Sequence, residues 1–328
     1  MIPRRSVLMQ LLLAPLLALP ERPFGQTARP ARIAWIAPGS AERQTHYLVA
    51  FKQGMSDLGL FEGRQYAVHA QFADGYYERF PAMVEAALQR EPAVIVVVTI
   101  ASVRAAQRAT ASVPIVFIST NDPVGSGLID SLAHPGGHTT GISNQAEDVV
   151  SRYVDLLRDA LPQSRRVAAL LNPGNPSNAG LFESVYSAAR RYGITVYPLA
   201  VDSPPAVDRA FEAMARAKPD ALLMLSDAML FDAHPRIALF ALKQRIPTIG
   251  PSPEQAESGM LLAYGASRPA MYRRAADYVK RILAGAKPGD MPVEQPTQFE
   301  LVVNQATAKA LGLVIPPLVM LRADRVIE

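Results

Sequence analysis

Two short apolar runs, rich in valine and isoleucine, lie close together in the first half of the chain, at residues 93–98 and 114–118. Each run is too short to be a comfortable helix, and neither alternates with polar residues as a half-exposed strand would. Such runs are typical of strands buried on both faces, as in a parallel sheet covered by helices. The stretch between them, residues 102–110, is rich in alanine and fits a short crossover helix. The sequence therefore predicts a β-α-β unit and an α/β fold.

Small polar residues follow both predicted strands. Residues 99–102 (TIAS) come after the first strand, and residues 119–123 (STNDP) come after the second. In an open α/β sheet, ligands bind in the crevice beyond the carboxyl ends of the strands. We therefore expect these two loops to lie side by side at a ligand-binding site.

The alternation of strands and helices continues along the chain. The N-terminal part predicts strands at 32–37, 66–72 and 140–143 and helices at 42–58 and 77–89, in addition to the unit described above. The pattern restarts near Gln145, with helices at 149–160, 179–191, 205–217 and 232–244 and strands at 166–171, 194–199, 221–225 and 247–250. The tail adds strands at 259–264 and 299–303 and helices at 269–283 and 304–311. Two similar α/β lobes with a mixed tail indicate several crossings between lobes, and therefore a hinge.

Length and composition agree with two folded lobes and an exported protein. The chain has 328 residues, enough for two domains at roughly 150 residues each. It has no cysteine, which excludes disulfides, thiolate metal sites and a cysteine nucleophile. Arg4 and Arg5 precede an apolar run at 7–19 that is shorter than the roughly 20 residues of a membrane span. We expect residues 1–28 to be a signal peptide, of the ordinary or the twin-arginine kind, and the mature protein to be periplasmic.

Common catalytic and metal-binding patterns are not found in the sequence. The five histidines show no metal-ligand spacing: His46, His69, His134, His138 and His234. Neither Ser119 nor Ser226 lies in a G-x-S-x-G setting, and no GK[ST] follows Gly125-Ser126-Gly127. Basic residues are scattered along the chain, which gives little support for nucleic-acid binding. We therefore expect no enzyme, no metal, no cofactor and no nucleic-acid partner.

Two readings are open for each polar candidate in the first half. Asp122 either pairs with a ligand ammonium or hydroxyl, or caps an ordinary Asn-Asp-Pro turn. Thr99 and Ser102 lie at a predicted helix N-terminus, which suits a ligand carboxylate, and both also suit a plain helix cap. A cap residue can line a cleft, so the two roles are compatible.

The candidates in the second half have the same ambiguity. Asn175 and Ser177 lie in the loop after the predicted strand 166–171, and Asn175 is most simply a turn residue. Asp227 begins a helix, so capping and ligand binding are equally good readings. Tyr264 ends a strand next to Gly265 and either stacks on a ligand or packs in the hinge.

The whole mature chain resembles the periplasmic-binding-protein-like substrate-binding components of ABC uptake transporters, in particular the group that includes binders of tryptophan and other aromatic amino acids. The resemblance is carried by FKQGM (51–55), LGLFEG (58–63), PIVF (114–117), DPVGSGL (122–128), SLAHPGG (131–137), NP (172–173), AYG (263–265), YRRAA (272–276) and LVVN (301–304). His138 departs from the usual pattern, and the first strand is followed by a short loop, Pro38-Gly39-Ser40-Ala41. These departures leave open a ligand other than an aromatic amino acid.

The resemblance implies a type I periplasmic-binding fold, with two Rossmann-like lobes joined by a three-crossover hinge. Lobe 1 would comprise residues 30–144 plus 265–290, and lobe 2 residues 145–264 plus 291–328. A monomer would bind a small molecule, an amino acid or another aromatic or carboxylate compound, and deliver it to an ABC permease in the inner membrane. The expected ligand-binding residues are Ser40, Thr99, Ala101, Ser102, Thr120, Asn121, Asp122, Asn175, Ser177, Asp227 and Tyr264.

Two other functions fit a two-lobe scaffold. A ligand-sensing protein of a signalling system, such as a transcriptional repressor, would need a DNA-binding segment ahead of the first lobe, where this chain has a signal-like sequence. An enzyme would need a catalytic constellation, and the sequence offers no base–nucleophile pair or cofactor loop.

Overall fold

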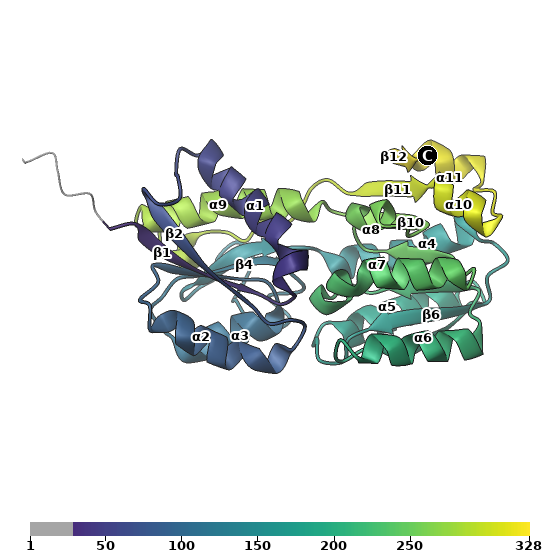
Figure 1. Cartoon of the computed structure of the whole chain (residues 1–328), viewed down its shortest axis with the longest axis horizontal. Coiled ribbons are helices and arrows are strands. Elements are labelled where there is room, and N and C mark those ends of the chain that lie inside the picture. Colours follow the sequence, from purple (N-terminus) through teal and green to yellow (C-terminus); the bar gives the residue numbers. More distant parts are fainter. Residues whose placement is uncertain (1–28) are drawn as a thin grey trace, which may run out of the picture.

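The computed structural model describes residues 29–328, and the predicted signal peptide lies outside them. The chain forms two α/β lobes that lie side by side (Figure 1). Each lobe has one sheet with helices on both faces, so the prediction of two similar α/β lobes is confirmed. In the described part of the chain, no helix is both long enough and apolar enough for a membrane span.

The first lobe contains a five-stranded parallel sheet in the order β2-β1-β3-β4-β5. Its strands are β1 (Ala31–Ala37), β2 (Tyr66–Phe72), β3 (Val94–Val97), β4 (Ile115–Thr120) and β5 (Thr139–Ser143). One face is covered by α1 (Ala41–Asp57) and α9 (Arg268–Leu283), and the other by η1 (Tyr77–Arg79), α2 (Phe80–Leu88) and α3 (Ile100–Ala109). Every residue of β3 and β4 is buried, as expected for central strands.

The second lobe contains a seven-stranded sheet in the order β12-β11-β10-β9-β8-β6-β7. Its strands are β6 (Arg166–Leu171), β7 (Thr195–Ala200), β8 (Ala221–Met224), β9 (Thr248–Gly250), β10 (Leu262–Gly265), β11 (Glu300–Asn304) and β12 (Arg325–Ile327). All neighbours are parallel except β10 and β11. The helices are α4 (Ala146–Ala160), α5 (Asn178–Arg190), α6 (Ala206–Ala217), α7 (Ala228–Lys243), α8 (Pro253–Glu257), α10 (Gln305–Leu311) and α11 (Pro317–Arg322).

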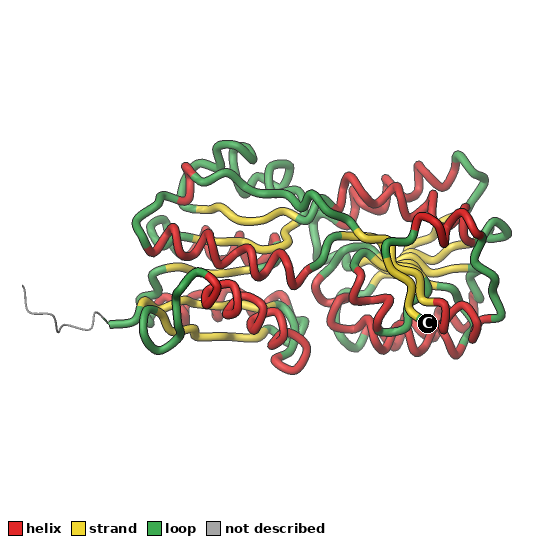
Figure 2. Tube along the Cα trace, turned by 90° about the horizontal axis from the view of Figure 1, so that it is seen from above, coloured by secondary structure: helices red, strands yellow, loops and turns green. Residues whose placement is uncertain are grey.

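The chain crosses between the lobes at three places. It passes from β5 to α4, from β10 to α9, and from η2 (Pro288–Asp290) to β11, and Figure 2 shows these connections between the lobes from above. Met291 and Val293 pack in the apolar clusters of the first lobe, so the last crossing follows them. Because three segments join the lobes, the expected motion is hinge closure of two rigid bodies.

Some elements of the second lobe were not predicted. Helix α8, helix α11 and strand β12 are short, and the sequence pattern predicts no element at these residues. Helix α7 begins at Ala228, four residues before the predicted start. The reason is that Asp227 accepts hydrogen bonds from the backbone N–H groups of Met229 and Leu230 and so caps the helix.

Close packing of α1 against α9 attaches the hinge helix to the first lobe. Gly54 of α1 lies against the backbone of Arg273 in α9, where a Cβ atom would overlap the Arg273 carbonyl oxygen. Glycine is otherwise unfavourable inside a helix, so this close approach explains its presence.

We expect Gly54→Ala to lower the free energy of unfolding by about 1–3 kcal/mol, because overpacking outweighs the gain in helix propensity. Gly180 in α5 is the matched control, because no described atom beyond its own turns of helix lies within 4 Å of the position of its Cβ. Gly180→Ala should stabilise the protein by about 0.5–1 kcal/mol. Thermal unfolding followed by circular dichroism measures both. Equal effects of the two substitutions would contradict this account of the packing.

Candidate functional site

The carboxyl ends of the central strands of both sheets face each other between the lobes. Strand β3 of the first lobe ends just before Thr99 and β4 ends at Thr120, and strand β8 of the second lobe ends just before Ser226 and Asp227. In each sheet the chain order reverses beside these strands, at β1/β3 and at β6/β8. These are the positions at which α/β sheets bind ligands.

The backbone at the end of β4 adopts a conformation that is rare for a serine. Ser119 has φ +54°, and the register of β4 against β5 shifts between Ile118 and Thr120. The Ser119 carbonyl oxygen accepts a hydrogen bond from Asn144 Nδ2 at 3.1 Å, and the same amide donates to Ser226 Oγ of the second lobe at 3.3 Å. Strained residues of this kind are concentrated at functional sites.

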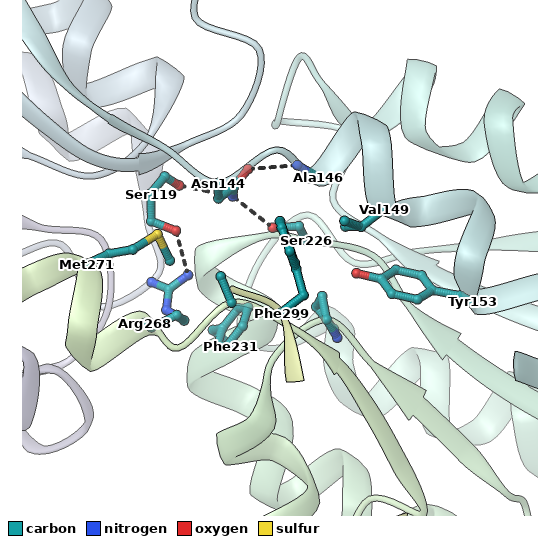
Figure 3. Close-up of a pocket in the computed structure, with 13 residues that line it drawn as sticks. Ser119, Asn144, Ala146, Val149, Tyr153, Ser226, Phe231, Arg268, Met271 and Phe299 are labelled. Atoms are coloured by element: carbon teal, nitrogen blue, oxygen red, sulfur yellow. Dashed lines mark hydrogen bonds between the residues drawn. The ribbon is translucent and has the colours of Figure 1, made fainter. Parts of the chain in front are cut away.

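Two adjoining cavities occupy the space between the lobes. Each has a volume of about 20 Å³, and they share Ser119, Ser226 and Arg268 in their walls. The first, which we call the apolar cavity, is lined in addition by Asn144, Ala146, Val149, Tyr153, Phe231, Pro251, Gly265, Ala266, Met271 and Phe299 (Figure 3). The second, which we call the polar cavity, is lined in addition by Val98, Thr99, Ile100, Thr120, Asn121, Asn175, Asp227 and Ala228.

Asp227 is the buried acidic group of the polar cavity, and its oxygens are already occupied. Besides capping α7, it accepts hydrogen bonds from Tyr77 OH at 3.0 Å, Asn172 Nδ2 at 3.2 Å and Asn175 Nδ2 at 3.1 Å. Burial raises the pKa of Asp227, and these hydrogen bonds oppose the rise. Burial and the neighbouring carboxylate hold the pKa of Tyr77 well above its usual value, so Tyr77 remains a donor.

Hydrogen bonds across the cleft hold the lobes together in this structure. Tyr77 of the first lobe donates to Asp227 of the second, and Asn121 Nδ2 donates to Ser177 Oγ at 2.7 Å. Asp232 of α7 accepts from the backbone N–H of Ser40 at 2.8 Å and from Gln44 Nε2 at 2.5 Å. Burial raises the pKa of Asp232, and both donors oppose the rise. The lobes are therefore in a closed arrangement.

The structure brings about half of the predicted residues to one place. Thr99, Thr120, Asn121, Asn175 and Asp227 line the polar cavity. Ser40 and Ser177 lie at the same interface and form the cross-lobe bonds described above.

The other four predicted residues are placed differently. Ser102 is fully buried in a reciprocal capping box with Thr99, and Ala101 lines a separate groove on the outer side of the cleft. Asp122 Oδ1 accepts from the backbone N–H of Gly125, as in the turn-cap reading, and Asp122 is not among the described residues that line either cavity. Tyr264 packs beside Phe299, with ring centroids 6.1 Å apart, and likewise lines neither cavity.

Sequence reasoning missed the walls of the apolar cavity and the residue shared by both cavities. Tyr153, Phe231, Met271 and Phe299 come from helices or connections, and the sequence pattern gives them no role. Arg268 was missed because the helix was expected to begin at Pro269. The signal was its place just after strand β10, the position used to select the other candidates.

The described residues include no cluster of three or more histidine, cysteine or acidic side chains that could hold a metal ion. The cavities offer hydroxyl and amide groups, helix N-termini, one guanidinium and aromatic rings. The cavities of this closed arrangement are too small for an organic molecule, so the lobes must separate to admit one; the groups in the walls are of the kinds that contact such a ligand.

Comparisons with known proteins agree with this geometry. The family described as "ABC transporter substrate binding protein" matches residues 38–327. A tyrosine-binding protein of Clostridioides difficile is 23% identical over 263 residues, which make up 80% of this chain and 75% of that protein. A solved structure of a conserved domain protein from Vibrio cholerae superposes with a TM-score of 0.84, at 26% identity, over 91% of this chain and all of that one. An ABC domain from Streptococcus pneumonia in complex with L-Trp superposes with a TM-score of 0.80, at 22% identity, over 90% of this chain and all of that one.

The fold and the enclosed cavities thus define a two-lobe solute-binding protein, and the predicted type I periplasmic-binding fold is confirmed. The chain belongs to the ABC transporter substrate binding protein family.

We expect Tyr77→Phe to weaken the closed arrangement, because it removes a hydrogen bond to a buried carboxylate worth about 1.5–3 kcal/mol. Small-angle X-ray scattering of the ligand-free protein should show a larger radius of gyration for this variant than for the parent. Tyr192→Phe is the matched control, since Tyr192 OH donates to Asp155 within the second lobe. A radius of gyration unchanged by Tyr77→Phe would contradict the cross-lobe role.

Proposed function

We propose that this protein binds a small molecule in the paired cavities between its lobes and carries it to an ABC permease without breaking any bond in it. The observation that supports this most directly is the junction of both sheets at a common pair of cavities, closed by hydrogen bonds from one lobe to the other. Closure then depends on the ligand, which shifts the equilibrium by its greater affinity for the closed state.

The ligand we propose is an amino acid with an aromatic side chain. The apolar cavity supports this, because Tyr153, Phe231 and Phe299 line it and aromatic rings pack favourably on one another. The names of two similar proteins also support it, since one is a tyrosine-binding protein and the other is in complex with L-Trp. Thr99, Thr120, Asn121 and Asn175 would hydrogen-bond the polar end of the ligand from the polar cavity.

We further propose that the protein is a monomer, exported to the periplasm by a signal within residues 1–28. The support is the basic start and short apolar run of that segment. Release of this segment would leave the two lobes free to meet the permease. Mass spectrometry of the protein recovered from the periplasm of its host would locate the new N-terminus.

A ligand screen tests the proposal. The purified mature protein is mixed with single amino acids, sugars and other small metabolites, and its melting temperature is recorded. A ligand at about 100 times its Kd should stabilise the folded protein by about 2.7 kcal/mol, and the shift should grow with concentration. We expect L-tryptophan or L-tyrosine to give such a shift and to be recovered unchanged. Chemical conversion of the compound would contradict a carrier function and favour an enzyme.

A further inference from the structure

Arg268 is a buried cation without an ion-pair partner among the residues that the structure describes. It is the first residue of α9, at the crossing from the second lobe back to the first, and its exposed fraction is 4%. Its Nη1 and Nη2 atoms contact Ser119 Oγ and Tyr272 OH, each at 3.5 Å, and its Nε atom has no hydrogen-bond partner among the described residues. Such contacts are at the limit of hydrogen bonding. Burying a guanidinium without a bidentate acidic partner is unfavourable, and the nearby Glu254 offsets part of this cost.

Arg274 of the same helix forms an ordinary ion pair and serves as a comparison for Arg268. Arg274, two turns further along α9, binds Glu294 through two nitrogens, at 2.8 Å from Nε and 2.6 Å from Nη2. Each nitrogen donates to a different carboxylate oxygen, which is the bidentate geometry that a guanidinium and a carboxylate favour. Arg268 lacks this counterpart.

The acidic groups nearest to Arg268 are engaged elsewhere. Asp227 is occupied by its five donors, and Asp232 by Ser40 and Gln44. Glu254 accepts the backbone N–H of Arg268 at 3.2 Å and the hydroxyl of Ser252, and no carboxylate of the described residues lies within 4.0 Å of the Arg268 guanidinium nitrogens. The neighbouring acids thus partly compensate the positive charge of Arg268 without forming an ion pair with it.

Aromatic rings hold the Arg268 guanidinium in place beside the two cavities. Its central carbon lies 4.1 Å from the centroid of the Phe231 ring and 5.1 Å from that of Tyr47. Figure 3 shows the guanidinium directed toward Ser119 at the cavity wall. Stacking on rings fixes the orientation of the plane and leaves its edge available for hydrogen bonds.

Two helix N-termini reach the polar cavity. Thr99 and Ile100 begin α3, and Asp227 and Ala228 begin α7. The N-terminal end of each helix carries a partial positive charge, which favours an anion. The α7 end is already capped by the Asp227 carboxylate, so the α3 end and the Arg268 guanidinium are the groups at the junction of the two cavities that favour an anion.

We propose that Arg268 binds a carboxylate of the ligand, so that the molecules accepted by this protein are carboxylic acids whose apolar part occupies the apolar cavity. The proposal rests on the proposed carrier function and deepens it by naming the group that is recognised. Arg268 would also affect the equilibrium between the open and closed lobes. Without an anion, closing the lobes buries an unpaired charge, and a ligand carboxylate removes this penalty. Arg268 therefore makes closure depend on an acidic ligand.

Isothermal titration calorimetry with matched probes tests the recognition. L-Tryptophan carries the indole ring, the amine and the carboxylate. L-Tryptophanamide has the ring and the amine but no carboxylate, and 3-indolepropionate has the ring and the carboxylate but no amine. The corresponding three tyrosine compounds are used in parallel. We expect the amides to bind at least about 10-fold more weakly than the acids, as for loss of a charged hydrogen bond. The variant Arg268→Gln should lose this preference, and Arg268→Lys should retain part of it. Arg273→Gln is the control, because Arg273 is on the same helix and pairs with Asp57 at the surface.

The outcomes separate the two proposals. Equal affinity for acids and amides, or an acid preference that survives Arg268→Gln, overturns the role of Arg268 and leaves the carrier function intact. Binding of neutral sugars alone has the same meaning. Failure of the parent protein to bind any compound in this set or in the wider screen contradicts both proposals.

A measurement without any ligand tests the electrostatic penalty independently. In Arg268→Met the closed state no longer buries a cation, so small-angle X-ray scattering of the ligand-free variant should give a smaller radius of gyration than that of the parent. A radius equal to or larger than that of the parent would contradict the penalty. Circular dichroism confirms that the variant is folded.

Discussion

Closing two lobes over a cavity removes polar groups from water, and each such group then needs a partner. In this protein most of them find one across the cleft: Tyr77 with Asp227, Asn121 with Ser177, and Gln44 with Asp232. Unsatisfied buried polar groups cost about 1–3 kcal/mol each, so these pairs make closure affordable without making it strongly favourable. Arg268 is the exception, because its charge is buried and forms no ion pair with any acid among the described residues. The balance between the satisfied pairs and this one unsatisfied cation determines when the protein closes.

Because each lobe is rigid, a small free-energy difference between the open and closed states decides how the two lobes are arranged. Each sheet has apolar clusters on both faces, and the helices that carry the cleft residues are attached through them. The hinge helix α9 belongs to the first lobe by packing, through the contact at Gly54, yet its first residue lies at the cleft. A charge at the start of this helix therefore acts at the crossing about which the lobes turn. The type I fold, shared with the proteins it resembles, supplies the frame for this arrangement.

The fold could be predicted from the sequence because its central strands are unambiguous. The apolar runs at β3, β4, β6 and β8 fix the parallel sheets, and the rule about strand ends then located Thr99, Thr120, Asn175 and Asp227 at the polar cavity. The rule could not tell that Asp122 turns back to cap its own loop, since that depends on the left-handed backbone, φ +30°, at this residue. It also could not find the distant partners of Asp227, which come from η1 and from the loop after β6 and are brought together only by folding.

A distance measurement between the lobes tests the central claim most directly. The chain has no cysteine, so spin labels at Ala86→Cys in α2 and Glu212→Cys in α6, both exposed, report only the separation of the two lobes. Double electron–electron resonance is recorded with and without L-tryptophan or L-tyrosine. The account predicts a broad distribution at longer distances without ligand and a narrow, shorter one with it. The same distribution in both samples, under conditions where calorimetry shows binding, would contradict closure around the ligand.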